Sequence, residues 1–400
     1  MPHLPEITID SSLRPRLQQG HPWIYRNHVV SSERLRSGQW VRVRCGNWSA
    51  YGLWDATSPI AVRIFSRTAV PDADWFAERV WEAWDLRATV RDAVLPTNAY
   101  RWIYGEGDAL PGLVADRYGD FAVIHTYAES IAAIVPQVAA AMRACDHELR
   151  GVAWHSRAQD EEESDAPRSA SLRSVWGELP PRDLVVQEHG LFFHADLWHG
   201  QKTGLFLDQR ENRRMIESLA AGRRVLNCFA YTGGFSLYAL RGGAAEVISA
   251  DIGRGLAEAA DQNVALNHLP AQRHQFVTED CFALLDGYVK TGRRFDLLIL
   301  DPPSFARAKG NAHAAQRAYT RLNALAIRCI EPGGLLVTAS CTSQISPEAF
   351  RTMLAEVAAT TQRRIQIIHD AGQPYDHPVP AAFPEGRYLK FLVARILPMA

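Results

Sequence analysis

Apolar runs and stretches of helical spacing alternate along the second half of the chain. From residue 224 onward this alternation predicts seven short strands and five helices. The expected strands are residues 225–229, 246–250, 273–278, 297–300, 335–339, 364–369 and 388–396. The expected helices are residues 235–241, 255–267, 282–289, 312–329 and 347–358. Strands alternating with helices predict an α/β domain whose parallel sheet lies between helices, with an antiparallel final strand because no helix precedes it.

The first half of the chain follows shorter patterns. Runs separated by turns at residues 40–45, 51–54 and 60–66 predict a compact β barrel over residues 1–70. Helical spacing at 75–90 and 131–149, with two strands around a turn at 100–127, predicts a central α+β domain. Residues 156–181 are rich in Ser, Asp, Glu and Pro and are expected to form an exposed acidic insert. The sequence therefore predicts three domains, residues 1–70, 71–195 and 196–400.

The overall composition is that of an ordinary globular protein. The chain has 400 residues, of which 47% are hydrophobic and 22% charged, enough apolar material for the cores of about two or three domains. No apolar run approaches the ~20 residues of a membrane span, and no signal peptide is recognised. The six cysteines are scattered and include no CxxC pair, which argues against a disulfide framework and a zinc site, so a reducing cytoplasm is expected.

Residues 1–70 combine arginines with aromatic side chains. Nine arginines stand against four acidic residues there, interleaved with seven aromatic residues. Arginine neutralises phosphate and aromatic rings stack on bases, so the segment favours RNA binding. A small β domain with an aromatic core and a solvated arginine rim explains the same composition, and both interpretations stay open. The expected RNA contacts in this segment are Arg14, Trp23, Arg26, Arg42 and Arg44.

Three of the expected strands end in residues suited to a nucleoside cofactor. A turn with Gly233 and Gly234 follows the first strand and permits close approach of a ligand, without the GxGxxG spacing of dinucleotide sites. Asp251 ends the second strand, where ribose hydroxyls donate to a carboxylate, and Asp280 follows the third as an expected partner of an adenine amino group. Each acid is also a common helix N-cap residue. Together these positions predict the cofactor half of a site.

A carboxylate and a thiol follow the fourth and fifth strands. Asp301 begins the run DPPSF, and Cys341 lies in the run SCT. Parallel strands bring their carboxyl ends to one edge, so both side chains are expected at one pocket. A thiolate that adds to C6 of cytosine activates C5, while a carboxylate holds the N3/N4 edge of the base. The sequence thus predicts a cytosine C5 methyltransferase with Cys341 as nucleophile, and Phe305 either stacks on the base or packs in the core.

These motifs resemble those of a known family, the bacterial 23S ribosomal RNA large-subunit methyltransferases of the cytosine-5 type. Residues 200–210 (GQKTGLFLDQR) are similar to its KTGxFLDQR signature, and residues 228–235 to its first S-adenosylmethionine motif. Residues 301–305 and 340–342 resemble its fourth and sixth motifs, and residues 376–378 with 384–390 its C-terminal signature. Residues 20–25 resemble the start of its PUA domain, an RNA-binding barrel, and residues 105–113 its central region.

The resemblance implies a fold and a set of roles. It implies a PUA barrel, a central α+β domain and a Rossmann-like methyltransferase domain that uses S-adenosylmethionine and no metal. The implied partner is 23S ribosomal RNA, naked or in a partly assembled large subunit, and self-association as a homodimer stays open. The implied cofactor contacts are Lys202, Asn227, Phe229, Tyr231, Thr232, Gly233, Asp251, Asp280 and Asp301. Two departures are the acidic insert and Phe391, which stands where the C-terminal signature has glycine.

Other activities remain compatible with the sequence. A DPPSF turn also resembles the turns that hold planar amines, so transfer to guanine N7 or to an exocyclic amine without a covalent adduct stays open. A non-catalytic RNA-binding assembly factor is the second alternative, and the glycine pattern disfavours an NAD-dependent oxidoreductase. One interpretation of the run before the sheet is that it folds over the cofactor or contacts RNA phosphates through Lys202, Thr203, Gln209 and Arg210. The other is a structural ion-pair cluster of Asp208, Arg210, Arg213 and Arg214, and both stay open.

Overall fold

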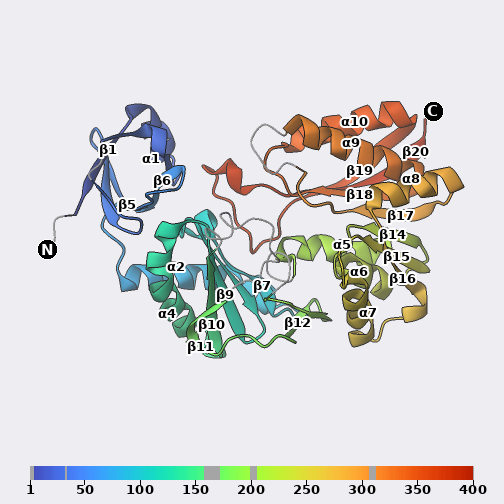
Figure 1. Cartoon of the computed structure of the whole chain (residues 1–400), viewed down its shortest axis with the longest axis horizontal. Helices are drawn as coiled ribbons and strands as arrows, with labels where there is room; N and C mark the ends of the chain where they lie inside the picture. Colours follow the sequence, from blue (N-terminus) through green and yellow to red (C-terminus); the bar gives the residue numbers. More distant parts are fainter. Residues whose placement is uncertain (1–3, 32–33, 157–171, 199–204, 306–311, 400) are drawn as a thin grey trace. The chain divides into compact units, whose positions relative to one another are not determined.

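The computed structural model describes residues 4–31, 34–156, 172–198, 205–305 and 312–399 (Figure 1). Its contacts divide the chain into two compact units. The first unit comprises residues 1–190, 195–207 and 375–386, and the second comprises residues 191–194, 208–374 and 387–400. The acidic insert falls largely on residues 157–171, outside the described part of the chain. In that part, no helix is long and apolar enough to cross a membrane.

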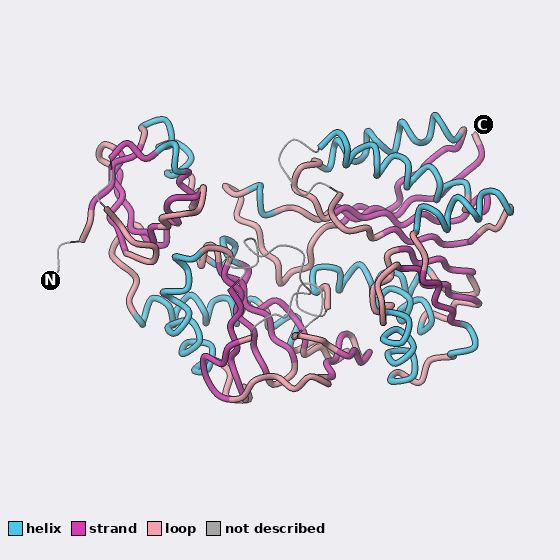
Figure 2. Tube along the Cα trace, viewed as in Figure 1, coloured by secondary structure: helices cyan, strands magenta, loops and turns pink. Residues whose placement is uncertain are grey.

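The N-terminal sheet of the first unit is a six-stranded, near-closed barrel. Its strand order is β2-β6-β5-β4-β1-β3, and Figure 2 shows the strands curving into a ring. Apolar side chains from alternate positions, such as Ile7, Val41 and Val43, are fully buried inside it. The strands are β1 (Glu6–Ile9), β2 (Trp23–Tyr25), β3 (Val29–Ser31), β4 (Trp40–Cys45), β5 (Trp48–Trp54) and β6 (Ile60–Ser66), with the short helix α1 (Arg14–Gln18). The predicted barrel is confirmed.

A five-stranded mixed sheet follows in the same unit, in the order β11-β10-β9-β8-β7. Its strands are β7 (Ala99–Tyr104), β8 (Leu113–Tyr118), β9 (Phe121–Thr126), β10 (Gly151–Ser156) and β11 (Arg173–Gly177), and its helices are α2 (Ala73–Leu86), α3 (Ala88–Arg91) and α4 (Val135–Cys145). The expectation of two strands over residues 100–127 is wrong, because the segment turns twice, at Gly112 and at Gly119, and so makes three strands. The unit also contains β12 (Val185–Glu188).

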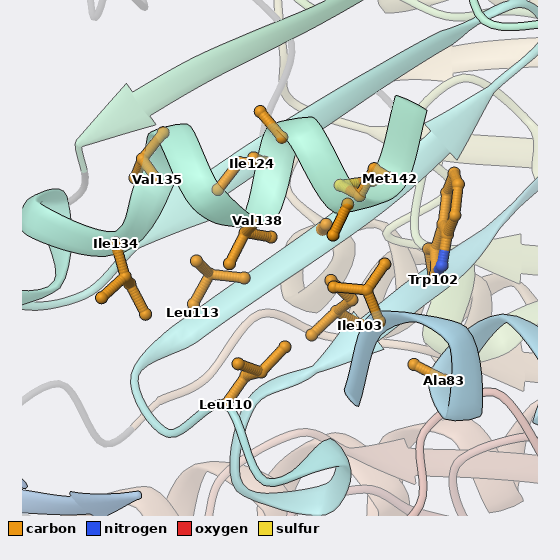
Figure 3. Close-up of a cluster of buried hydrophobic side chains, with 14 of the residues drawn as sticks. Ala83, Trp102, Ile103, Leu110, Leu113, Ile124, Ile134, Val135, Val138 and Met142 are labelled. Carbon is orange, nitrogen blue, oxygen red and sulfur yellow. The ribbon is translucent and has the colours of Figure 1, made fainter. Parts of the chain in front are cut away.

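Helix packing builds the core of this central sheet. The Asp72 side chain caps α2 by accepting from Trp75 N, and Phe76, Val80 and Ala83 then recur at helical spacing on its buried face. Val135, Val138 and Met142 are buried side chains of α4, and Figure 3 shows them in one cluster with strand residues such as Leu113 and Ile124. The apolar stripes of both helices and the strand residues form one continuous cluster that holds this sheet.

The second unit contains the predicted seven-stranded sheet, in the order β16-β15-β14-β17-β18-β20-β19. Its five leading strands pair in parallel, and β20 is antiparallel to both β18 and β19, as predicted. The strands are β14 (Arg224–Cys228), β15 (Glu246–Asp251), β16 (His274–Thr278), β17 (Phe295–Leu300), β18 (Ile330–Ser340), β19 (Arg363–Ala371) and β20 (Lys390–Pro398). Strand β18 begins five residues before the expected start, because the Pro-Gly-Gly run at 332–334 lies within the strand beside an irregularity in its pairing with β17.

Helices cover both faces of this sheet. Figure 1 shows α5, α6 and α7 on one face and α8, α9 and α10 on the other. They are α5 (Arg210–Leu219), α6 (Gly234–Arg241), α7 (Leu256–Leu266), α8 (Cys281–Thr291), α9 (Ala312–Arg328) and α10 (Pro347–Thr361), and the unit also contains β13 (Leu191–His194). The strand order reverses between β14 and β17, and in open α/β sheets ligands bind beyond the carboxyl ends of the strands at such a reversal. The candidate residues therefore fall at the edge where this fold binds ligands.

Candidate active site

The loop after β14 has an unusual backbone. Phe229 and Tyr231 have left-handed φ angles of 60° and 49°, and Gly233 follows with a φ of 82°. For non-glycine residues this conformation costs roughly 1–2 kcal/mol each. The surrounding structure offsets that cost, since Asn263 Nδ2 donates to Thr232 O at 3.1 Å and Tyr231 N donates to Asp251 Oδ2 at 3.0 Å. Strain of this kind clusters at ligand-binding sites, where a loop is held ready for its partner.

Asp251 joins this loop to the loop after its own strand. Its Oδ2 accepts from Tyr231 N at 3.0 Å, and its Oδ1 accepts from Gly253 N at 3.1 Å. A carboxylate has about four acceptor positions, so two backbone bonds leave capacity for ribose hydroxyls. The next residue, Ile252, is 69% exposed and offers an apolar surface at the same edge. The Asp251 carboxylate thus holds the two loops together and keeps acceptor positions for a ligand.

Asn227 is fully buried beneath the loop after β14. Its Nδ2 donates to Ser236 Oγ at 3.0 Å, and the chain of hydrogen bonds continues through Ser249 to His274 Nε2. Burial lowers the pKa of His274, which favours the neutral ring in this chain of bonds. Among the described residues, Asn227 Oδ1 meets no donor. This buried acceptor and the Asp251 carboxylate fit the ammonium and hydroxyl groups of S-adenosylmethionine.

Asp280 caps helix α8 at the end of the next strand. Its Oδ1 accepts from Ala283 N at 3.0 Å, so Asp280 is the N-cap residue of α8, one of the two roles expected from the sequence. The residue is exposed, and its second oxygen adds another acceptor to the carboxyl edge of the sheet. The neighbouring Cys281 is 2% exposed and accepts from Phe229 N at 3.3 Å. The Cys281 thiol thus helps to hold the backbone of the loop after β14.

Asp301 is held by an amide network that the sequence did not reveal. Gln209 Nε2 donates to Asp301 Oδ1 at 2.9 Å, and Asn212 Nδ2 donates to Gln209 Oε1 at 2.7 Å. Asn212 also donates to Gly372 O at 3.3 Å, and both amide side chains are buried. Gln209 thus anchors Oδ1 of the carboxylate, and Asp301 is only partly buried. The conspicuous DQR run was the available signal, although its partner could not be inferred from spacing.

Cys341 lies just beyond the end of β18 and is partly exposed. Leu300 pairs with Thr338 across β17 and β18, so Asp301 follows opposite residue 339 and Cys341 lies two residues farther along. With strand spacings of 3.3 and 4.8 Å, the two Cα atoms are separated by roughly 8 Å. Burial is the main cause of the raised pKa of the Tyr319 phenol on α9, and this phenol lies close enough to Cys341 and Asp301 for negative charge on either group to raise that pKa further. The carboxylate and the thiol are thus neighbours.

Phe305 packs among aromatic rings beside this pair. Its ring centroid lies 4.8 Å from Tyr319, 6.0 Å from Phe282 and 6.5 Å from Phe229. Phe305 therefore packs against other aromatic side chains, which is one of the two roles expected from the sequence. The side chain is only partly buried, so part of its ring surface is also available.

Lys390 is a buried cation next to the thiol. It pairs with Ser340 across β20 and β18, and only 3% of its surface is exposed. Its Nζ donates to Thr342 O and, at 2.7 Å, to Tyr388 O. Burial lowers the pKa of Lys390 to about 8, and the nearby charge of Cys341 acts in the opposite direction. In the sequence this lysine stands out only as the last residue of the C-terminal signature, before Phe391 in the place of glycine.

The residues around Asp208 lie in the interior of the second unit. Tyr388 OH donates to Asp208 Oδ2, and Arg210 Nε donates to Glu211 Oε1 at 3.0 Å. Arg210 is fully buried, and Arg213 is 3% exposed. Lys202 lies outside the described residues, as do residues 199–204 as a whole.

The expected RNA contacts of the barrel are spread over different environments. Arg26 donates to Ser58 O at 2.8 Å and lies over the Trp54 ring, while Trp23 Nε1 donates to Glu106 Oε1 at 2.7 Å. The side chains of Arg26 and Trp23 thus both donate hydrogen bonds to other residues of the first unit. Arg42 is partly buried on β4.

The exposed arginines gather around the hairpin between β4 and β5. Arg14 donates to Asn47 Oδ1 at 2.5 Å, and Arg44, about half exposed, lies 3.4 Å from Glu6 Oε1. Arg67 joins them, since its Nε donates to Ser49 O at 3.1 Å and its guanidinium lies 4.7 Å from the Trp48 ring centroid. Composition had not singled out Arg67, because only the fold brings residue 67 next to residue 48.

Comparisons with known proteins agree with this geometry. A family model described as "S-adenosylmethionine-dependent methyltransferase" matches residues 162–382, more than half of the chain, and one described as "PUA-like domain" matches residues 7–67. The chain is 36% identical to the Klebsiella pneumoniae protein named ribosomal RNA large subunit methyltransferase I over 98% of both chains. It is 37% identical to the Erwinia tasmaniensis protein of the same name over 95% of this chain and 96% of that protein.

A solved structure shares the fold along nearly the whole chain. It is described as "a putative methyltransferase complexed with SAH", and it superposes with a TM-score of 0.85 at 23% identity, covering 98% of this chain and 99% of that one. S-adenosylmethionine is the cofactor of this fold's matched family, and the acceptors at the ends of β14 and β15 suit it. The chain belongs to the S-adenosylmethionine-dependent methyltransferases, in the family of the ribosomal RNA large subunit methyltransferase I proteins.

Proposed function

We propose that this protein methylates C5 of a cytosine in 23S ribosomal RNA and that Cys341 is the nucleophile. The names of its full-length relatives support large-subunit ribosomal RNA as substrate. The single observation that carries the chemistry is the adjacency of a partly exposed thiol, Cys341, to an anchored carboxylate, Asp301, at the cofactor edge of the sheet. A methyltransferase that acts directly on a nitrogen has no use for that thiol.

The roles of the two groups follow from the electronic needs of the base. Cytosine C5 is a weak nucleophile until a thiolate adds at C6, which places electron density on C5. Cys341 forms this bond, and Asp301 binds the N3/N4 edge as charge develops on the ring. S-adenosylmethionine supplies the methyl group as a sulfonium. Loss of the C5 proton then allows the Cys341–C6 bond to break and restores the aromatic ring.

The cofactor contacts belong to the loops after β14, β15 and β16. Asp251 binds the ribose, Asp280 lies near the adenine, and the backbone from Phe229 to Gly233 lines the cofactor. Their support is the strained, hydrogen-bonded loop and the free acceptor positions described above. Lys202 is proposed on the family resemblance alone.

The barrel supplies RNA affinity in this proposal. Arg14, Arg44 and Arg67 present cationic groups around one hairpin, which suits a phosphate backbone. A base in a duplex cannot reach a thiol at a sheet edge, so the target cytosine is unpaired or flipped out when it reacts. Phe305 offers the exposed part of its ring for stacking on that base.

Covalent trapping tests the proposal. We expect ribosomal RNA with 5-fluorocytosine at the target to form an adduct with the wild-type protein that survives denaturing electrophoresis, because fluorine cannot leave as a proton. The Cys341→Ala variant should bind S-adenosylhomocysteine normally and form neither the adduct nor 5-methylcytosine. Cys145→Ala, at the other partly exposed cysteine, is the matched control. Methyl transfer that persists in Cys341→Ala without any adduct would instead indicate direct transfer to guanine N7 or an amine.

A further inference from the structure

A buried lysine lies beside the proposed nucleophile. Lys390 begins strand β20, directly opposite Ser340, and Cys341 is the next residue of the neighbouring chain segment. Its Nζ donates to the carbonyl of Thr342, the residue after the cysteine, and to the carbonyl of Tyr388 at 2.7 Å. The amino group is therefore held between the backbone of Thr342, one residue after the thiol, and the backbone of Tyr388 on its own segment. The two hydrogen bonds fix its position and use two of the three donors that an ammonium carries.

The choice of lysine at this position is informative. The chain contains 39 arginines and only four lysines, at positions 202, 290, 309 and 390. Arginine cannot release its proton in a protein, whereas a buried lysine shifts its pKa readily. Burial lowers the pKa of Lys390 to about 8, so the neutral amine and the ammonium are both accessible near neutral pH. Both hydrogen-bond acceptors of Nζ are backbone carbonyls, so in the described part of the chain no ion pair fixes the charge of Lys390.

Two other ionisable groups near Cys341, on Asp301 and Tyr319, do not favour a thiolate. Asp301, at the end of β17, carries a negative charge that opposes a second one nearby. Tyr319 of α9 keeps its proton, because burial raises the pKa of its phenol. Asp208 is occupied by the hydroxyl of Tyr388. Lys390, by contrast, is a cation close to the thiol.

We propose that Lys390 is the positioning residue that activates Cys341, by accepting the thiol proton and holding the thiolate as an ammonium–thiolate pair. In this step the S–H bond breaks, an N–H bond forms at Nζ, and the electron pair remains on sulfur, so the net charge of the pair is unchanged. The carbonyls of Thr342 and Tyr388 stabilise the resulting ammonium. The same ammonium stabilises the thiolate again when it leaves C6. This inference rests on the proposed cysteine mechanism and extends it to a second residue.

The pH dependence of Cys341 alkylation tests the inference without RNA or methyl transfer. The protein is treated with iodoacetamide between pH 6 and 9.5, and the rate at the Cys341 peptide is followed by mass spectrometry. In the wild type we expect the midpoint of the rate profile to lie below ~8.5, the value of an ordinary cysteine. A wild-type midpoint at or above that value would overturn the inference, whatever the variants do.

Variants at Lys390 provide the second readout. Lys390→Met keeps the length of the side chain and removes its charge, so we expect the midpoint to rise by about one pH unit and the rate at pH 7 to fall about tenfold. Lys390→Arg supplies a cation that cannot accept the thiol proton, so we expect it to recover only part of that rate. Lys290→Met is the matched control, because Lys290 is exposed on α8 and pairs with the partly exposed Asp286. Thermal denaturation and S-adenosylhomocysteine binding report whether each variant is folded.

The outcomes separate this inference from the proposed function. An unchanged profile in folded Lys390→Met, with normal 5-fluorocytosine trapping in the wild type, would make Lys390 merely structural while the cysteine mechanism stands. A shifted profile together with no trapping in the wild type would leave the lysine–cysteine pair in place and refute the covalent mechanism. A shifted profile with normal trapping supports both.

Discussion

The cofactor site offers the sharpest single test, at Asp251. The substitution Asp251→Asn keeps the shape of the side chain and one of its acceptor oxygens but removes the charge and turns the other oxygen into a donor. That oxygen is Oδ1 or Oδ2, each of which accepts from a backbone amide, Gly253 N at 3.1 Å and Tyr231 N at 3.0 Å. We therefore expect both weaker cofactor binding and a modest loss of stability, because one backbone N–H loses its acceptor.

The size of the binding effect follows from the hydrogen bond that is removed. A charge-assisted bond from a ribose hydroxyl contributes about 1.5–3 kcal/mol, which corresponds to a dissociation constant raised roughly 10- to 150-fold. The loss of one backbone partner costs about 1–3 kcal/mol of unfolding free energy. Asp251→Ala removes both acceptors at once, so it should destabilise the protein more than Asp251→Asn does. The two effects are measured separately, by calorimetry and by denaturant unfolding.

The assay is titration calorimetry with S-adenosylhomocysteine on the full chain. Asp286→Asn is a suitable control, since Asp286 lies on the outer surface of α8 and pairs with Lys290. The control should bind with wild-type affinity. A dissociation constant for Asp251→Asn within about twofold of the wild type, in a folded protein, would refute the assignment of this carboxylate to the ribose.

The same geometry leads to three further predictions. Replacing Arg14, Arg44 and Arg67 together by alanine should weaken RNA binding. The slope of log affinity against log salt should decrease by about 0.7–0.9 for each phosphate that is no longer neutralised. An unchanged slope would mean that these arginines have a structural role and do not contact RNA. Gln209→Leu should lower kcat while leaving the cofactor affinity unchanged, since Gln209 orients Asp301, and Gln316→Leu on α9 serves as its control; equal kcat values would contradict this. The lowered pKa of Lys390 means that the unfolded chain binds more protons than the folded chain between pH 8 and 10.5. The free energy of unfolding should therefore rise with pH across that window by comparison with Lys390→Met. The same pH dependence of the unfolding free energy in both proteins would show that folding does not lower the pKa of Lys390.

The C-terminal fold could be predicted because its information is local. Each strand of the second unit is a short apolar run, and each helix repeats apolar residues at its own period, so the order of elements could be derived before any contact was known. The position of Asp251, Asp301 and Cys341 at one edge also followed, because parallel strands always present their carboxyl ends together. The middle region was harder, since residues 100–127 contain two turn signals and only one was counted as a turn between strands.

The side-chain partners were decided only by the tertiary structure. Gln209 reaches Asp301 across 92 residues and Lys390 reaches Thr342 across 48, and no periodicity links such positions. The environment of Trp23 and Arg26 was equally hidden, because composition cannot distinguish an exposed arginine from one that donates to nearby carbonyls. The sequence by itself determined which chemical groups reach the sheet edge. Only the fold decided which neighbours hold them and how deeply they are buried, because both depend on contacts between strands and helices far apart in the chain.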